Sequence, residues 1–227
     1  MRWGAVRNMK NNENKVLIIT GGLVLEEFLS RLVKKEQYSM MIAVDYGLTV
    51  ADRLNLPLDY IVGDFDSVSE ELLQKYSDKA IPIQTFPTEK DKTDTQIAIE
   101  LALMYNATSI DLVGATGNRL DHVLANIHLL MLPMQLSIDA CILDSNNKIY
   151  LKKENFSIQK EKQYGNFVSF LPFAGKVSGL ILKGLKYPLN GITLTAGSSL
   201  GISNVIMEEK AEVKFTEGIL IVVEAMD

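Results

Sequence analysis

The hydrophobic pattern of this 227-residue chain changes partway along, and this change limits the possible folds more than any other feature. In the first part, short apolar runs rich in β-branched residues alternate with segments that have helical spacing. The runs lie at 16–20, 41–45, 60–64, 80–86 and 110–114. Strands that alternate with helices form right-handed βαβ units around a parallel sheet. We therefore predict an α/β domain with a mainly parallel sheet at residues 16–145.

After about Ser145 the pattern becomes one of closely spaced strands, and no segment of helical length is evident. Strands are predicted at 148–152, 166–172, 179–183, 192–195, 212–215 and 219–223. The pair Asn190-Gly191 has the composition of a hairpin turn. Residues 146–227 are therefore predicted to form an all-β sandwich. The polar residues 1–15 are expected to be a flexible N-terminal extension.

Two helices of the first domain are well marked. One has apolar residues at helical spacing from Ile97 to Met104, and Thr93 with Gln96 fits a capping box that would start it at Asp94. The other runs from Leu120 and is predicted to end at Pro133, because proline cannot continue a helix.

The overall composition excludes several functions. A net charge of −5 provides no basic surface for nucleic acid. The single cysteine, Cys141, rules out an internal disulfide and a four-thiolate zinc site. No apolar run has the length that crosses a membrane. We expect a soluble, cytoplasmic protein that binds neither nucleic acid nor membrane.

Acidic residues follow several of the predicted strands of the first domain. The residues are Asp45, Asp64, Asp66, Asp91, Asp94 and Asp121. Sheets of this kind bind their ligands at the carboxyl ends of the strands. These side chains are therefore candidates for one common site.

Asp64 and Asp66 are two residues apart, so in an extended chain both face one side and Phe65 faces the other. An isolated D-x-D pair is most often a solvated loop. Here the pair ends a strongly apolar strand and has other acids nearby, which favours a bound divalent cation. Hard oxygen donors without a His or Cys cluster indicate Mg²⁺. For Asp91 and Asp94, helix capping is as good an explanation as function.

A third cluster runs from Gly114 to His122, where a turn leads from a strand into a helix. Its backbone N–H groups are suited to phosphate, Arg119 to a forked contact with phosphate oxygens, and Asp121 to a metal or a hydroxyl. The alternative is an ordinary turn with Asn118 as the helix cap. His122 adjoins this cluster, whereas His128 is predicted to lie on another face of the helix. A glycine pair at 21–22 suits either ligand approach or a plain turn.

These segments together resemble the ordered motifs of thiamine pyrophosphokinases. The motifs are Gly63-Asp64-Phe65-Asp66-Ser67, Lys90-Asp91-Lys92-Thr93-Asp94, Gly114-Ala115-Thr116-Gly117-Asn118-Arg119-Leu120-Asp121-His122, Ala43-Val44-Asp45-Tyr46-Gly47 and Gly201-Ile202-Ser203-Asn204. The resemblance covers the chain from about Val16 to its end. Two positions depart from it: Asn118 stands where a glycine is usual, and Tyr46 where many members have glycine.

The resemblance implies transfer of a pyrophosphoryl group from ATP to the thiamine hydroxyl, which gives thiamine diphosphate and AMP. It also implies a homodimer whose β-domain contacts thiamine. By motif position, Mg²⁺ would be held by Asp64, Asp66 and Asp94, and Asp121 would join them as a catalytic acid. ATP would be contacted by Asp45, Lys92, Thr93, Arg119 and His122, and thiamine by Ser203 and Asn204.

Two alternatives to this function remain open at the level of sequence. One is another Mg²⁺-dependent D-x-D enzyme, a phosphohydrolase or a nucleotidyl or glycosyl transferase. The other is a non-catalytic dimer that binds ATP. Within the favoured reaction, either Asp94 or Asp121 is a candidate to accept the proton of thiamine.

Overall fold

The structure is a computed structural model that describes residues 13–85 and 91–227. Most of the predicted N-terminal extension (residues 1–12), the end of the predicted strand at Phe86, and Lys90 lie outside the described residues. The chain divides into two compact units between Ala140 and Cys141.

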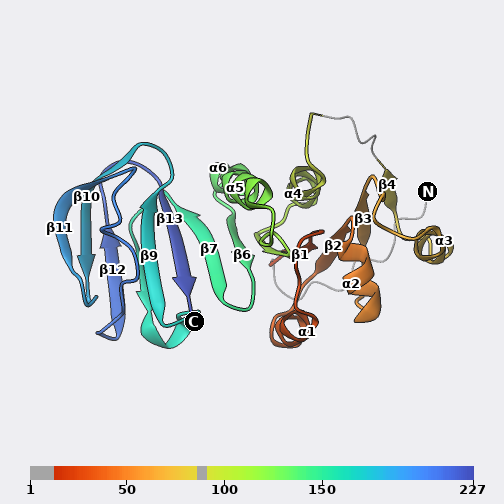
Figure 1. Cartoon of the computed structure of the whole chain (residues 1–227), viewed down its shortest axis with the longest axis horizontal. Coiled ribbons are helices and arrows are strands. Elements are labelled where there is room, and N and C mark those ends of the chain that lie inside the picture. The colour runs from red at the N-terminus through yellow and green to blue at the C-terminus, as the bar shows by residue number, and fades with distance from the viewer. Residues whose placement is uncertain (1–12, 86–90) are drawn as a thin grey trace. The chain divides into compact units, whose positions relative to one another are not determined.

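The first unit is an α/β domain with a parallel sheet, as predicted (Figure 1). The strands are β1 (Lys15–Ile19), β2 (Met40–Val44), β3 (Tyr60–Gly63), β4 (Ile83–Thr85) and β5 (Ser109–Val113). They lie in the order β4-β3-β2-β1-β5, and each neighbouring pair is parallel. Every residue of β2 is buried, which explains its continuous apolar run, since helices cover both faces of such sheets.

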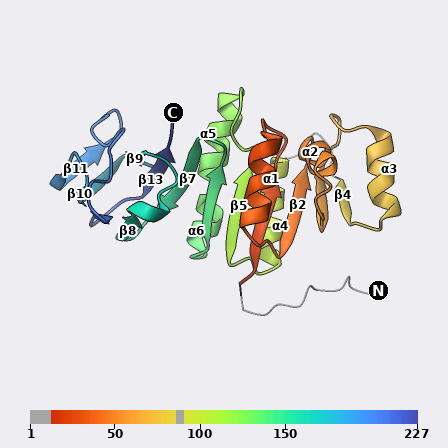
Figure 2. The same cartoon turned by 90° about the horizontal axis from the view of Figure 1, so that it is seen from below.

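The helices of this unit lie on both faces of the sheet. They are α1 (Glu26–Lys35), α2 (Gly47–Arg53), α3 (Glu70–Asp78), α4 (Asp94–Met104), α5 (Leu120–Leu129) and α6 (Met131–Gln135). Figures 1 and 2 place α1 and α2 on one face of the sheet and α4 on the other. Among the described residues, no helix is both long and apolar enough to cross a membrane. Because β1 to β5 are parallel, they all direct their carboxyl ends to the same edge of the sheet.

The helix boundaries confirm one prediction and correct another. Thr93 is the N-cap of α4, and its hydroxyl accepts a hydrogen bond from the Gln96 N–H at 3.2 Å. The prediction that Pro133 ends the second helix is wrong. The helix α5 ends at Leu129, and Pro133 lies inside the short α6, near its start. A proline near a helix start is tolerated because the first N–H groups have no partner within the helix.

The second unit is all-β, as predicted, and contains two antiparallel sheets. Its strands are β6 (Asp139–Leu143, which spans the unit boundary), β7 (Asn147–Lys152), β8 (Phe156–Gln159), β9 (Phe167–Pro172), β10 (Lys176–Lys183), β11 (Leu189–Thr195), β12 (Lys210–Lys214) and β13 (Leu220–Ala225). The orders are β6-β7-β13-β9 and β11-β10-β12-β8. Both sheets contribute fully buried side chains, such as Val168 and Phe170 from the first and Leu180 and Val213 from the second. The strands β6 and β8 were missed from the sequence.

The predicted hairpin at Asn190-Gly191 is wrong. Both residues lie inside β11, which pairs with β10 through an irregular register. Gly191 takes a φ of +71° within this irregular pairing. The composition that favours a hairpin turn therefore serves a distorted strand here.

Candidate active site

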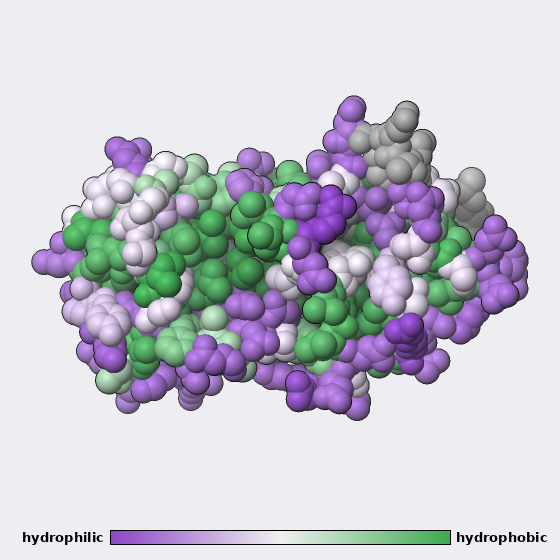
Figure 3. Space-filling view, in the orientation of Figure 1, coloured by the Kyte–Doolittle hydropathy of each residue, from purple (hydrophilic) through white to green (hydrophobic). Residues whose placement is uncertain are grey.

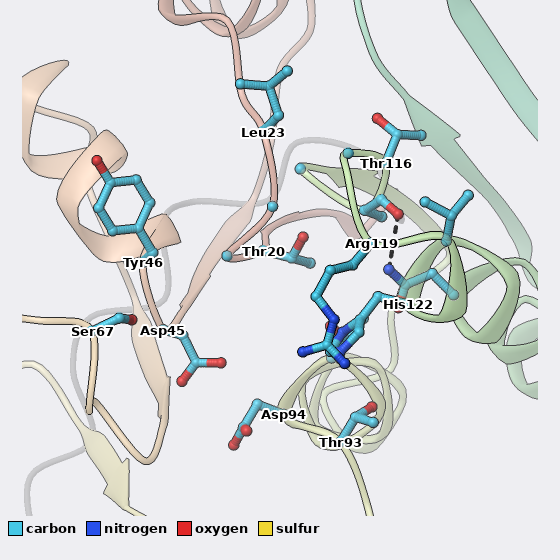
Figure 4. A pocket seen from close by; sticks show the side chains of 18 of the residues that line it. Thr20, Leu23, Asp45, Tyr46, Ser67, Thr93, Asp94, Thr116, Arg119 and His122 are labelled. Carbon is cyan, nitrogen blue, oxygen red and sulfur yellow. Dashed lines mark hydrogen bonds between the residues drawn. The ribbon is translucent and has the colours of Figure 1, made fainter.

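A pocket of about 840 Å³ lies at the carboxyl edge of the parallel sheet in the first unit (Figure 4). The residues that follow β1, β2, β3 and β5 line it, together with the start of α4 and one side of α5. Its lining includes the acids Asp45, Asp64, Asp66, Asp91 and Asp94, the bases Lys92, Arg119 and His122, and the neutral residues Thr93 and Asn126. Five segments that are far apart in the sequence thus meet in one cavity.

Most of the predicted site residues of this unit line the pocket. Figure 4 shows the side chains of Asp45, Asp94 and Arg119 pointing toward the same space. Asp121 is not part of the lining. His128 is also outside it, in agreement with the prediction that it lies on another face of the helix.

Asp64 and Asp66 reach the pocket by a turn rather than by the extended chain that we predicted. Phe65, between them, has a left-handed φ of 62° and is 6% exposed. The Asp66 N–H donates to Oδ1 of Asp64 at 3.2 Å, which closes the turn. Burial of the Phe65 ring stabilises this conformation, so both carboxylates stay on the pocket wall while the ring lies in the core.

Lys92 and Thr93 are placed by the start of α4. The Lys92 ammonium bonds both carboxylate oxygens of Glu100, at 2.9 and 2.8 Å. This hydrogen bonding, with a further bond from Gln96, lowers the pKa of Glu100. The Gln96 side chain also donates to Glu100, at 3.0 Å, and this bond holds the Glu100 carboxylate in place on α4. The result is a basic group held at the pocket wall by a neighbouring helix.

Arg119 forms a two-bond ion pair with Asp121, Nε to Oδ1 at 3.3 Å and Nη2 to Oδ2 at 2.7 Å. These hydrogen bonds from Arg119 lower the pKa of Asp121 to about 2. The alternative in which Asn118 caps α5 is wrong, because Arg119 is the N-cap residue and makes no side-chain cap bond. Asp121 thus holds the Arg119 guanidinium through two hydrogen bonds.

Two further residues shape the pocket from behind. Asn126 was missed from the sequence, although it lies one helical turn after His122 on the same face of α5. It is 7% exposed, and its Nδ2 donates to the Ala115 carbonyl at 2.9 Å. Gly22 has a packing role, since a Cβ there would lie 2.1 Å from the Gly114 carbonyl oxygen. The loops that follow β1 and β5 therefore pack backbone to backbone.

Ser203 and Asn204, predicted to contact thiamine, lie in the second unit between β11 and β12. Ser203 is exposed and has a left-handed φ of 54°. Asn204 is 2% exposed, and its carboxamide is bonded to the main chain of Tyr187 and Val205. The two neighbours thus differ sharply in their access to a ligand.

The carboxylates of the pocket suit a Mg²⁺ ion that takes only some of its ligands from the protein. Among residues 13–85 and 91–227, no group of three or more His, Cys, Asp or Glu side chains is placed to hold a metal ion. Mg²⁺ commonly uses one or two carboxylates and completes its shell with water and substrate phosphates. The carboxylates of Asp64, Asp66 and Asp94, all on the wall of one pocket, fit that pattern.

These features define a class: an α/β ligand-binding domain followed along the chain by an all-β domain. Residues 30–142 match the family described as "Thiamin pyrophosphokinase, catalytic domain". Residues 153–220 match "Thiamin pyrophosphokinase, vitamin B1 binding domain". The two matches fall in the two units in the expected order.

Individual relatives agree with this assignment. The chain is 34% identical over 194 residues to the thiamine pyrophosphokinase of Bacillus subtilis, which covers 85% of this chain and 90% of the relative. The crystal structure of a Bacillus subtilis thiamine pyrophosphokinase superposes with a TM-score of 0.83 at 30% identity, over 94% of this chain and 99% of that one. The yeast enzyme, at 18% identity, shows the same fold with a TM-score of 0.79 over 95% of this chain and 87% of its own. The chain belongs to the thiamine pyrophosphokinase family and is an enzyme of that family.

Proposed function

We propose that this protein transfers the pyrophosphoryl group of ATP to the hydroxyl group of thiamine, in a Mg²⁺-dependent reaction that yields thiamine diphosphate and AMP. The observation that carries the proposal is the pocket in which strand-end carboxylates meet Lys92 and Arg119. Family membership supports it over the two alternatives, a different D-x-D enzyme and a non-catalytic ATP-binding dimer.

The charges of the pocket support the proposed requirement for a cation. Five carboxylates on its wall would repel a triphosphate, while Lys92, Arg119 and His122 supply the positive side chains. In the proposal Asp64, Asp66 and Asp94 hold Mg²⁺. When bound, the ion would neutralise charge on the phosphate oxygens. Arg119 and Lys92 bind the triphosphate, with Asp45, Thr93 and His122 as further contacts.

The chemistry places few demands on the protein beyond orientation. The thiamine oxygen forms a bond to the β-phosphorus, and the bond between that phosphorus and the bridging oxygen to the α-phosphate breaks. AMP leaves with the electron pair, and the hydroxyl proton passes to a carboxylate. Neither candidate carboxylate is a strong base: the Arg119 pair lowers the pKa of Asp121 to about 2, and Asp94 would be bound to Mg²⁺.

Three further features belong to the proposal. Thiamine is bound through the segment that contains Ser203, in the second unit. The protein is a homodimer. Leu200, Ile202 and Met207 of the second unit are 55%, 41% and 59% exposed, which supports this part of the proposal. Apolar surface is visible in Figure 3. The protein works in the cytoplasm, in keeping with a single buried cysteine. Sedimentation of the purified protein tests the dimer, and a monomer at assay concentration would contradict it.

One assay tests the reaction. The protein is incubated with ATP, Mg²⁺ and thiamine, and the products are separated by chromatography. We expect AMP and thiamine diphosphate in equal amounts. ADP would indicate ordinary kinase chemistry, phosphate released without thiamine would indicate a hydrolase, and bound but unchanged ATP would indicate a non-catalytic protein.

A further inference from the structure

Asn204 is one of few buried polar residues in the described part of the chain, with 2% exposure. Its Oδ1 accepts hydrogen bonds from the N–H groups of Tyr187 and Val205, both at 3.0 Å. Its Nδ2 donates to the Tyr187 carbonyl at 2.8 Å. The oxygen has two lone pairs, and both are used. A ligand therefore has no acceptor left to bind and almost no surface to touch.

The main chain of Asn204 is bonded in another direction. Its N–H donates to the Val168 carbonyl at 2.9 Å, and its carbonyl accepts from the Val168 N–H at 2.8 Å. Val168 lies in β9 of the first sheet of this unit, and Tyr187 lies in the connection between β10 and β11 of the second sheet. Asn204 therefore links the first sheet, through its main chain, to the β10–β11 connection of the second sheet, through its side chain.

Ser203 depends on these attachments for its conformation. Its left-handed φ of 54° is unfavourable for a residue with a side chain and persists only when its neighbours are fixed. On one side the Ser203 N–H donates to Oγ of Ser169 at 3.0 Å, and on the other Asn204 is fixed by five hydrogen bonds. The backbone that carries the exposed Ser203 hydroxyl is thereby fixed.

We propose that Asn204 is a positioning residue for thiamine and not a thiamine ligand: its buried carboxamide clamps the Tyr187 main chain and so fixes the segment that presents Ser203. This inference rests on the proposed function. It replaces the sequence-based expectation that both Ser203 and Asn204 touch thiamine. A buried carboxamide whose oxygen and nitrogen are both hydrogen-bonded to the main chain acts through the backbone it holds.

The variant Asn204→Asp separates the two roles. It keeps the size of the side chain but places an oxygen against the Tyr187 carbonyl, which loses its donor. A positioning role predicts a rise of roughly tenfold in the thiamine KM, while the ATP KM and kcat change less than about twofold. A direct contact of thiamine with the side-chain oxygen predicts an unchanged or lower KM, because Asp keeps that oxygen and its negative charge attracts cationic thiamine. An unchanged or lower thiamine KM would therefore overturn the inference.

The control is Asn190→Asp, which adds the same charge at an exposed position of the same unit and should leave all constants unchanged. A wild-type enzyme that forms no thiamine diphosphate would refute the proposed function itself, a result distinct from an unaffected Asn204→Asp variant.

A second measurement uses the wild-type protein and does not depend on the folding of a variant. In NMR spectra, the side-chain amide of Asn204 should already be protected from hydrogen exchange without thiamine, and saturation with thiamine should leave its protection unchanged. An amide that exchanges freely and becomes protected only with thiamine would contradict the positioning role.

Discussion

Oδ1 of Asp45 lies at the position where a side chain on Gly63 would begin: a Cβ added to Gly63 would stand 2.1 Å from that oxygen. Asp45 follows β2 and Gly63 ends β3, and the two strands pair in parallel with Val44 opposite Val62. Asp45 has a left-handed φ of 47°, and its N–H donates to the Val62 carbonyl at 3.1 Å. The missing side chain at Gly63 thus admits the Asp45 carboxylate beside the turn that carries Asp64.

Gly63→Ala should displace the Asp45 carboxylate and inactivate the enzyme. Overpacking of this kind costs about 1–3 kcal/mol of stability, and we expect kcat/KM to fall on the order of 100-fold. The control Gly191→Ala also replaces a glycine, at a φ of +71° but with no atom within 4 Å of the new Cβ. It should lose about 1 kcal/mol and keep its activity. A fully active Gly63→Ala enzyme would show that the Asp45 position is unimportant.

Asn126→Ala should weaken the loop after β5. The Ala115 carbonyl, in a residue 2% exposed, would lose its donor, and such a loss costs about 1–3 kcal/mol. We expect a lower melting temperature and a higher KM for ATP. Leu124→Ala is the control on the same helix, since Leu124 is 59% exposed and outside the pocket. Equal effects of the two changes would argue against a role for Asn126.

Asp121→Asn tests whether Asp121 serves Arg119 or takes the proton. The pair with Arg119 lowers the pKa of Asp121 to about 2, so this carboxylate is a weak base near neutral pH. We expect a higher ATP KM, because Arg119 loses its anchor, and an unchanged pH dependence of kcat. Asp121→Glu keeps a carboxylate for the pair and should restore the ATP KM in part. Loss of an ionisation from the kcat profile of Asp121→Asn would instead make Asp121 the base.

We expect the free energy of unfolding of the first unit to fall at alkaline pH because of Tyr76. Burial, and a hydrogen bond of 3.0 Å to Asp52, raise the pKa of Tyr76 from 10.0 to about 12. The folded state therefore resists ionisation more than the unfolded state does. The stabilisation is complete below pH 10 and is lost as the pH rises from 10 to about 12.

In urea titrations, Tyr76→Phe should lower the free energy of unfolding by about 1 kcal/mol near neutral pH. The difference between wild type and variant should shrink toward pH 12. A difference that stays constant with pH would contradict the raised pKa.

The gathering of acids at one sheet edge was predictable because parallel strands end at the same edge. Asp45 and Asp64 could be placed there from the apolar strands that precede them. The turn at Phe65 was not predictable, since its left-handed backbone depends on burial of the ring in the tertiary fold. The Arg119–Asp121 pair is local in sequence, yet the absence of Asp121 from the pocket lining could not be read from the sequence.

Buried amides were the least visible feature in the sequence. An asparagine that holds a distant main chain, such as Asn126 or Asn204, has the same composition signal as one in a solvated loop. The prediction of a hairpin turn at Asn190-Gly191 was wrong for a related reason, because pairing of β11 with β10 outweighs the local preference for a turn. Local patterns therefore located the strands and the acids, whereas long-range hydrogen bonds determined which side chains support them.

The central claim is that Asp64 and Asp66 form the Mg²⁺-dependent centre of pyrophosphoryl transfer. Formation of AMP and thiamine diphosphate by Asp64→Asn and Asp66→Asn, beside wild type and an Asp78→Asn control, tests it most directly. Asp78 is an exposed acid on α3 outside the pocket, so its variant should match wild type. Both pocket variants should melt like wild type but lose on the order of 100- to 1,000-fold in kcat. Full activity of either pocket variant at ordinary Mg²⁺ concentration would contradict the account.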